Sequence, residues 1–208
     1  MSQLVLLLRG YKGSGKTTLA DKIFEFYKDD CWVISYADTL RDSANYLFGD
    51  IDFTSPDKKE EPLHQIYKGT DNYTLALAEM QKKDLYFGQA HTPRSLLLLL
   101  GAVCRFYNPN YFIDSLHQKI KEASEYSFKP KIIIVPDLRL KVEEEMSKSE
   151  LGKLGYKVIR VDILREPPKS EHMTERDLDG TVPDYVVDNT GELSSSVAQL
   201  INIIENNL

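Results

Sequence analysis

The sequence is poor in the residues that build metal centres and disulfide frameworks. Among 208 residues there are two cysteines, Cys31 and Cys104, and four histidines, and none stands at metal-ligand spacing. Two cysteines without paired spacing favour reduced thiols, as in a cytoplasmic protein. We therefore expect no metal site of cysteine and histidine, and a cytoplasmic location, which would be the host cytoplasm for a viral protein.

The sequence also lacks long apolar runs and an excess of positive charge. The runs at residues 4–8 and 96–100 are too short to cross a bilayer, and the first leads straight into a glycine-rich loop, unlike a signal peptide. The formal net charge of −6 argues against broad nucleic-acid binding. We expect small-molecule nucleotide partners, with neither nucleic acid nor membrane, and the sequence leaves a homodimer open.

One motif is complete. Residues 10–17, Gly-Tyr-Lys-Gly-Ser-Gly-Lys-Thr, match the phosphate-binding pattern Gly-x-x-x-x-Gly-Lys-Ser/Thr at every defined position. The apolar residues 4–8 predict a buried strand before the loop. Apolar residues at helical spacing predict an amphipathic helix after it: Leu19, Ala20, Ile23 and Phe26. Backbone N–H groups and a helix N-terminus would then point at one place, which suits a phosphate better than a turn that binds nothing.

The rest of the chain alternates between predicted strands and helices. Further apolar segments predict strands at residues 31–36, 131–135, 156–163 and 184–188. Helices are expected near Asp38, from Thr92 as N-cap, at residues 74–83 and 111–123, and at residues 193–204. This pattern predicts an α/β fold with a five-stranded parallel sheet and helices on both faces. We expect one domain over residues 1–208, with a helical insertion at about 50–128 and a polar lid at about 165–181.

Charged residues after the predicted strands are candidates for a site. Residues beyond the carboxyl end of a parallel strand line the ligand crevice, so Asp38 and Arg41 would share an edge with the loop. Asp137 follows the third strand, where phosphate-loop proteins hold the shell of Mg²⁺. Each has a plainer alternative: Asp38 can cap a helix with Arg41 in solvent, and Asp137 can cap the helix after it.

Two arginines and an acidic run complete the candidates. Arg94 and Arg105 flank the apolar residues 96–100, which predict a helix buried all round. An arginine beside so apolar a helix needs an anionic partner or an exit to water. The glutamates at residues 143–145 are expected to face solvent.

Several blocks together make the chain resemble the deoxynucleoside monophosphate kinases known mainly from bacteriophages, which are related to the animal-type phosphomevalonate kinases. The blocks are residues 9–17, 36–41, 92–101 with Arg105, 108–112, 136–139, 170–172 and 188–189. They follow the same order over nearly the whole chain. The Thr-Pro-Arg block at 92–94 and the Pro-Asp-Leu-Arg block at 136–139 narrow the resemblance within the P-loop kinases.

The resemblance implies a P-loop kinase fold and ATP-dependent transfer of the γ-phosphoryl group to a deoxynucleoside monophosphate, giving a diphosphate and ADP. The implied ATP-binding residues are Gly13, Ser14, Gly15, Lys16, Thr17 and Thr18. The implied acceptor-binding residues are Lys12, Asp38, Arg41, Arg94, Arg105, Asp137, Arg139, His172 and Glu175. Lys16, Arg139 and Arg165 would act on the transferring group, while Thr17 and Asp137 would hold Mg²⁺.

Two alternatives keep the same loop. One is a related kinase with a non-nucleotide phosphate acceptor such as phosphomevalonate, and the other is a non-catalytic ATP-binding switch protein. In-line phosphoryl transfer needs mainly positioning and cations around the moving charge. Only an acceptor kinase needs arginines at a second anion, because a guanidinium fork matches phosphate oxygens. Arg94 and Arg105 therefore argue against the switch, while the preferred base stays open.

Overall fold

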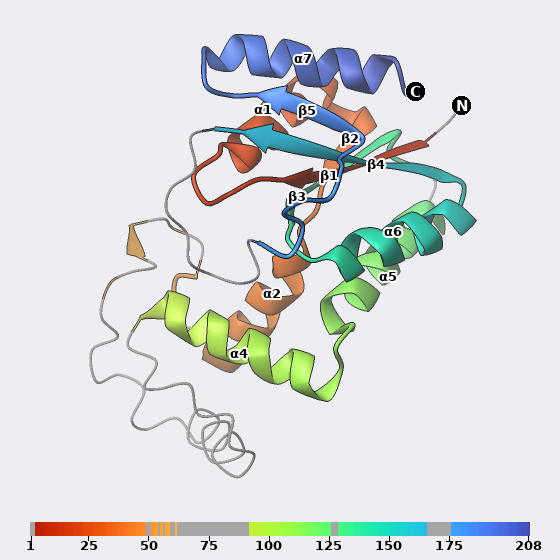
Figure 1. Ribbon diagram of the computed structural model, residues 1–208. Coiled ribbons are helices and arrows are strands. Elements are labelled where there is room, and N and C mark those ends of the chain that lie inside the picture. Colours follow the sequence, from red (N-terminus) through yellow and green to blue (C-terminus); the bar gives the residue numbers. More distant parts are fainter. Residues whose placement is uncertain are drawn as a thin grey trace. The chain divides into compact units, whose positions relative to one another are not determined.

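A computed structural model gives the fold (Figure 1). It describes residues 3–48, 51–53, 55, 57–58, 61, 92–125, 129–165 and 176–208. The predicted helix at residues 74–83 lies outside these ranges. The chain forms two compact units, Met1–Tyr36 with Ile113–Leu208 and Ala37–Phe112. We call the first the sheet unit and the second the helical unit. The helical unit begins and ends earlier in the chain than the predicted insertion at about 50–128.

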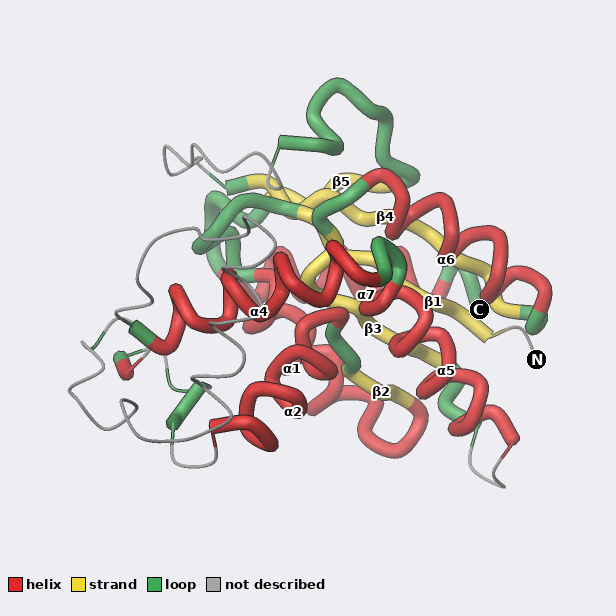
Figure 2. Tube along the Cα trace, turned by 90° about the horizontal axis from the view of Figure 1, so that it is seen from below, coloured by secondary structure: helices red, strands yellow, loops and turns green. Residues whose placement is uncertain are grey.

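The sheet unit is built on one parallel sheet. Its strands are β1 (Gln3–Arg9), β2 (Cys31–Val33), β3 (Ile132–Leu138), β4 (Tyr156–Leu164) and β5 (Tyr185–Asp188). They lie in the order β2-β3-β1-β4-β5 (Figure 2), and every neighbouring pair is parallel. The predicted five-stranded parallel sheet is confirmed. The second strand is shorter than predicted, because it ends at Val33 and the chain is already helical at Tyr36.

Helices cover both faces of this sheet. They are α1 (Lys16–Tyr27), followed by the short 3₁₀ turn η1 (Lys28–Asp30), α5 (Tyr111–Glu125), α6 (Lys141–Lys153) and α7 (Leu193–Glu205). Side chains alternate across a strand, so Leu4, Leu6 and Leu8 form a core with α1 and α7 on one face. In Figure 1, α5 and α6 lie on the opposite face. All residues from Leu4 to Leu8 are fully buried, as predicted.

One prediction for α1 is wrong. Leu19, Ala20 and Ile23 are buried as expected, but the side chain of Phe26 is 61% exposed. Tyr27, four residues after Ile23, takes the position that packs against the core. Because neighbouring helical residues are about 100° apart, Phe26 is turned toward solvent.

The helical unit holds α4 (Pro93–Tyr107) and all but the first residue of α2 (Tyr36–Phe48). Its core consists of Ala44, Phe48, Ile51, Phe53, Leu96 and Leu100. The predicted cap of α4 is confirmed: Thr92 Oγ1 accepts a bond of 3.1 Å from Ser95 N–H, Ser95 Oγ accepts one from Thr92 N–H, and Pro93 follows. The helix is not buried all round, however, because the side chain of Leu98 is 50% exposed.

Candidate functional site: a phosphate-binding loop

The sheet order defines where a ligand would bind. After β1 the chain runs into α1 on one face, and after β3 it runs into α6 on the opposite face (Figure 1). Neighbouring parallel strands whose connections leave in opposite directions form a topological switch point, and ligands of such sheets bind at the carboxyl ends there. Arg9 at the end of β1 pairs in register with Leu138 at the end of β3. Residues 10–15 and Asp137 therefore lie at this edge of the sheet.

Steric constraints explain why the loop has glycine at positions 10, 13 and 15. Gly13 and Gly15 have φ angles of +83° and +90°, a left-handed conformation that other residues rarely adopt. A Cβ at Gly10 would come within 2.6 Å of Ser14 Oγ and 2.7 Å of the Ile163 carbonyl oxygen. The backbone thus needs glycine at these positions of the motif for its own shape.

The loop ends in a helix N-terminus that no side chain caps. Gly15 is the N-cap of α1, it makes no side-chain cap bond, and the first turn contains no acidic residue. The first turn instead carries Thr17 and Thr18, and both residues are exposed. The first N–H groups of a helix have no partner within the helix, and together with the positive end of the helix dipole they favour an anion such as phosphate.

Lys16 is folded back onto the loop. Its Nζ donates hydrogen bonds to the carbonyl oxygens of Gly10 and Tyr11, the second at 2.9 Å, and to Ser14 Oγ at 3.2 Å. The ammonium is thereby surrounded by loop oxygens, and its charge is held at the place to which the loop and the helix start converge.

Two side chains from beyond the loop contact its backbone. Asn189, after β5, donates from Nδ2 to the carbonyl oxygen of Ser14 at 2.7 Å. Arg165, after β4, donates from Nη1 to the carbonyl oxygen of Gly13 at 3.3 Å. The sequence pointed to Arg165 as a lid residue. The sequence analysis included Asn189 only in the block at residues 188–189 and gave it no role. The sequence feature that could have indicated one is an amide side chain directly after an apolar strand.

A charged network that the sequence did not reveal holds the end of β1. Arg160 is fully buried and makes a two-point contact with Asp162, at 2.7 and 2.8 Å. Asp162 also accepts from Arg9 at 3.1 Å, and Arg9 pairs with Asp179 as well. Tyr11 in the loop donates to Asp179 at 3.0 Å, and partial burial together with Asp179 raises the pKa of this phenol. The network links the loop to β4 and to the turn at residues 176–180.

Asp137 caps a different helix from the one expected. Its carboxylate accepts from Ser35 Oγ at 2.6 Å and from the N–H of Tyr36, the first residue of α2, at 3.0 Å. The start of α6 is instead capped by Glu143, whose Oε2 accepts from the N–H groups of Arg139 and Leu140, both at 2.9 Å. Glu143 is consequently buried, so the prediction that it faces solvent is wrong. A reach of three or four residues back to its own helix start explains this burial.

The other predicted residues belong to several different elements. Lys12 in the loop and Arg139 after β3 are exposed, and the side chain of Arg94 lies in the first turn of α4. In the helical unit, Arg41 pairs with Asp38 at 2.8 Å, and the Arg105 guanidinium lies 4.8 Å from the centre of the Phe112 ring. His172 and Glu175 lie outside the described residues. Residues 166–175 of the predicted lid also lie outside the described residues. Further along the predicted lid, residues 176–180 form turns.

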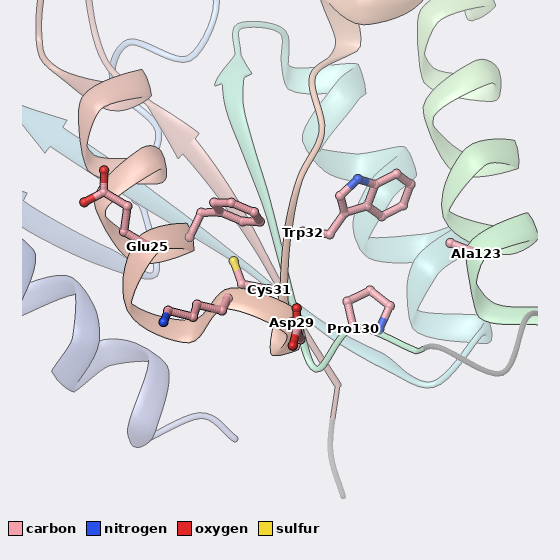
Figure 3. A pocket seen from close by; sticks show the side chains of 8 residues that line it. Glu25, Asp29, Cys31, Trp32, Ala123 and Pro130 are labelled. Atoms are coloured by element: carbon pink, nitrogen blue, oxygen red, sulfur yellow. The ribbon is translucent and has the colours of Figure 1, made fainter.

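A cavity of about 730 Å³ lies at the opposite edge of the sheet (Figure 3). Its lining includes Cys31 and Trp32 at the start of β2, Ala123 of α5 and Pro130 just before β3. None of the predicted site residues lines it. Burial raises the pKa of the Cys31 thiol to about 12, so this thiol stays protonated near neutral pH and is a poor nucleophile.

Within the described ranges, no helix combines the length and the apolar character that a membrane crossing requires. No protein-family model matches the sequence, and no curated protein sequence matches it. Among solved structures, the chain is similar to a mutant of the APS kinase CysC of Mycobacterium tuberculosis, with 10% sequence identity and a TM-score of 0.47. The match covers 98% of this chain and 98% of the other.

Proposed function

We propose that this chain is a kinase that transfers the γ-phosphoryl group of ATP to a deoxynucleoside monophosphate. The observation that carries the proposal is the loop at residues 10–17. It lies at the switch point of a parallel sheet, its helix start is uncapped, and the ammonium of Lys16 is held among its oxygens. This combination suits the triphosphate of a nucleotide.

The donor side follows from these groups. Lys16 would exchange the carbonyl oxygens of Gly10 and Tyr11 for oxygens of the β- and γ-phosphates, and the N–H groups at the start of α1 would bind the same chain of phosphates. An oxygen of the acceptor phosphate then forms a bond to the γ-phosphorus while the bond to the bridging oxygen breaks, and ADP leaves. The acceptor phosphate is already ionised, so the step needs no general base.

The residues present fit Mg²⁺, which would neutralise the charge of the donor phosphates. Mg²⁺ is usually held by one or two protein oxygens together with phosphate oxygens and water. Thr17 is exposed in the first turn of α1, and the carboxylate of Asp137 is oriented by Ser35 and Tyr36 at the neighbouring strand end. We assign Thr17 as a direct ligand and Asp137 as a partner through water.

On the acceptor side, the proposal assigns the monophosphate group to arginines. Those of the helical unit are Arg41, Arg94 and Arg105, and Arg139 follows β3. Arg41 would exchange its present partner Asp38 for the acceptor phosphate. Planar guanidinium groups bind phosphate oxygens in pairs, which orients the acceptor as well as attracting it. Lys12 would add charge from the loop, and the roles of His172 and Glu175 rest on the resemblance.

A coupled assay of ADP release tests the proposal. Purified protein with ATP and Mg²⁺ is offered each deoxynucleoside monophosphate, each ribonucleoside monophosphate and phosphomevalonate. We expect turnover with at least one deoxynucleoside monophosphate. Turnover with phosphomevalonate alone would establish the non-nucleotide acceptor. Tight ATP binding without turnover of any acceptor would favour the switch, and failure to bind ATP would overturn the assignment of the loop.

A further inference from the structure

Asn189 is a buried side chain that the proposed reaction does not use directly. It follows β5 and is only 7% exposed. Its backbone N–H donates to the carbonyl oxygen of Leu164, at the end of β4, over 2.8 Å. Its side-chain Nδ2 donates to the carbonyl oxygen of Ser14 over 2.7 Å. One residue therefore joins the ends of two strands to the middle of the phosphate-binding loop.

The neighbours of Asn189 fix its backbone. The carboxylate of Asp188 accepts from the N–H of Thr190 at 2.9 Å and from its hydroxyl at 2.6 Å, which closes a local turn around Asn189. Ser196 of α7 donates to the carbonyl oxygen of Asp188 at 2.9 Å. With its main chain held from β4 and α7, the amide of Asn189 has little freedom to leave the loop.

Because a peptide unit is rigid, the contact of Asn189 with the Ser14 carbonyl also fixes the direction of the Gly15 N–H on the other side of the loop. The bond between Ser14 and Gly15 is trans, and in a trans peptide the C=O and the N–H point in opposite directions. By holding the Ser14 oxygen, Asn189 directs the Gly15 N–H away from itself. The fit is close, because a Cβ on Gly15 would lie 2.4 Å from Nδ2 of Asn189. The amide thus occupies space that only glycine at position 15 leaves.

We propose that Asn189 is a positioning residue for phosphate binding. Its amide holds the Ser14–Gly15 peptide so that the Gly15 N–H and the start of α1 point at the phosphates of the nucleotide. This inference rests on the proposed function of the loop. The proposed effect of Asn189 concerns the phosphates alone and includes no contact with the nucleoside.

The test compares Asn189→Asp with a matched control, Asn207→Asp. The first change keeps the size of the side chain but sets a carboxylate oxygen against the Ser14 oxygen. Asn207 is equally buried, at 6%, and its Nδ2 likewise donates to a backbone oxygen, that of Ile203, at 2.6 Å. Melting temperature, hydrogen exchange of the amides of residues 13–17 in the free protein, and affinities for Mg²⁺ with ATP or with inorganic tripolyphosphate are measured for the parent and both variants.

We expect Asn189→Asp to weaken the binding of ATP and of tripolyphosphate alike, by at least about tenfold, since a buried acceptor left facing a like charge costs more than one lost bond. Exchange at residues 13–17 should quicken. Asn207→Asp should leave the affinities and this exchange unchanged, although its melting temperature falls. Parental tripolyphosphate affinity in Asn189→Asp, or a loss confined to ATP, would overturn the inference.

The two proposals can fail separately. If the parent protein binds ATP and tripolyphosphate but turns over no acceptor, the proposed function is wrong, whereas weaker binding of both ligands by Asn189→Asp would still support the positioning role. If the parent binds neither ligand, both proposals are wrong. If the parent binds both ligands and the exchange is the same in the parent and in Asn189→Asp, the positioning role is wrong and the proposed function stands.

Discussion

One arginine–aspartate pair of the sheet unit and one of the helical unit differ sharply in burial. In the sheet unit, Arg160 is fully buried and its partner Asp162 has a side chain only 8% exposed. In the helical unit, Arg41 and Asp38 are neighbours on one helix, with side chains 33% and 37% exposed. Charges of the first kind are fixed by the fold, whereas charges of the second kind can exchange partners cheaply. The loop at residues 10–17 is thus joined through Tyr11 and Asp179 to the buried network, whereas Arg41 can exchange Asp38 for another anion.

The largest effect should come from breaking the buried network. Asp162→Ala leaves the guanidinium of Arg160 buried with one partner fewer and also removes one carboxylate partner of Arg9, which keeps Asp179. Loss of one side of a buried ion pair typically lowers the free energy of unfolding by about 3–5 kcal/mol. Asp38→Ala in the helical unit should lower it by less than about 1 kcal/mol. Urea unfolding of both variants measures the contrast, and equal losses would remove the distinction between the units.

Next in size is the loss of the loop cation. Lys16→Ala should reduce kcat at least about 100-fold, because a cation at the transferring phosphate stabilises the transition state in a dry site. Lys22→Ala is the control, since Lys22 lies on the exposed side of α1 and pairs with Glu25. The coupled ADP assay reads both variants. Near-normal turnover without the Lys16 ammonium would exclude the loop as the donor site.

Changes in the proposed acceptor arginines should have a smaller effect, which is restricted to the KM for the acceptor. Arg94→Ala or Arg105→Ala should raise the KM for a deoxynucleoside monophosphate by about 10- to 150-fold, since a charge-assisted bond contributes about 1.5–3 kcal/mol. ATP affinity should hardly change. Lys58→Ala serves as the control, because Lys58 is an exposed cation of the same unit.

The melting temperature distinguishes an arginine that binds the acceptor from one that stabilises the helical unit. If Arg94 or Arg105 mainly stabilises the helical unit, its variant melts earlier and loses affinity for both substrates together. A variant that melts normally and keeps the parental KM would contradict the acceptor assignment of that arginine.

What could be predicted from the sequence was local. The strands β1 and β3 contain uninterrupted apolar runs at residues 4–8 and 132–135, and the loop between β1 and α1 is a complete motif with glycine where the backbone needs it. The cap of α4 is also local, since Thr92 and Ser95 are three residues apart. Each of these features depends on residues within one turn or one strand of each other.

What could not be predicted depends on partners far along the chain. The fully buried Arg160 in β4 is compensated by hydrogen bonds to Asp162, Glu144 and Thr181. The sequence of β4 alone does not indicate the last two partners. Glu143 is the local exception: its partners, the N–H groups of Arg139 and Leu140, are only four and three residues away, but residues 143–145 have the pattern of a solvated acidic run. The contact of Asn189 with the loop spans 175 residues. The sequence thus predicts the candidate loop itself, whereas the side chains that support the loop become visible only in the folded sheet.

The smallest expected effect is a pH dependence that comes from one histidine of the sheet unit. His117 of α5 bonds through Nε2 to Ser147 Oγ at 3.0 Å, and the fully buried Ser147 also bonds to the hydroxyl of Tyr36 at 2.8 Å. Burial lowers the pKa of His117, although the carboxylates of Asp114 and Glu150 act in the opposite direction. Unfolded histidine has a pKa of about 6.5, so the imidazole is neutral in both states well above that pH and its contribution to stability is complete there.

As the pH falls below about 6.5, the unfolded chain takes up this proton before the folded protein does, so the free energy of unfolding decreases. The decrease stops once the pH has passed the lowered pKa of the folded state. His117→Gln keeps a polar partner for Ser147 but cannot titrate. The difference in unfolding free energy between parent and variant, measured by urea unfolding from pH 8 to pH 5, should therefore shift against the parent as the pH falls. A difference that stays constant with pH, or that shifts in favour of the parent, would show that burial does not lower the pKa of His117.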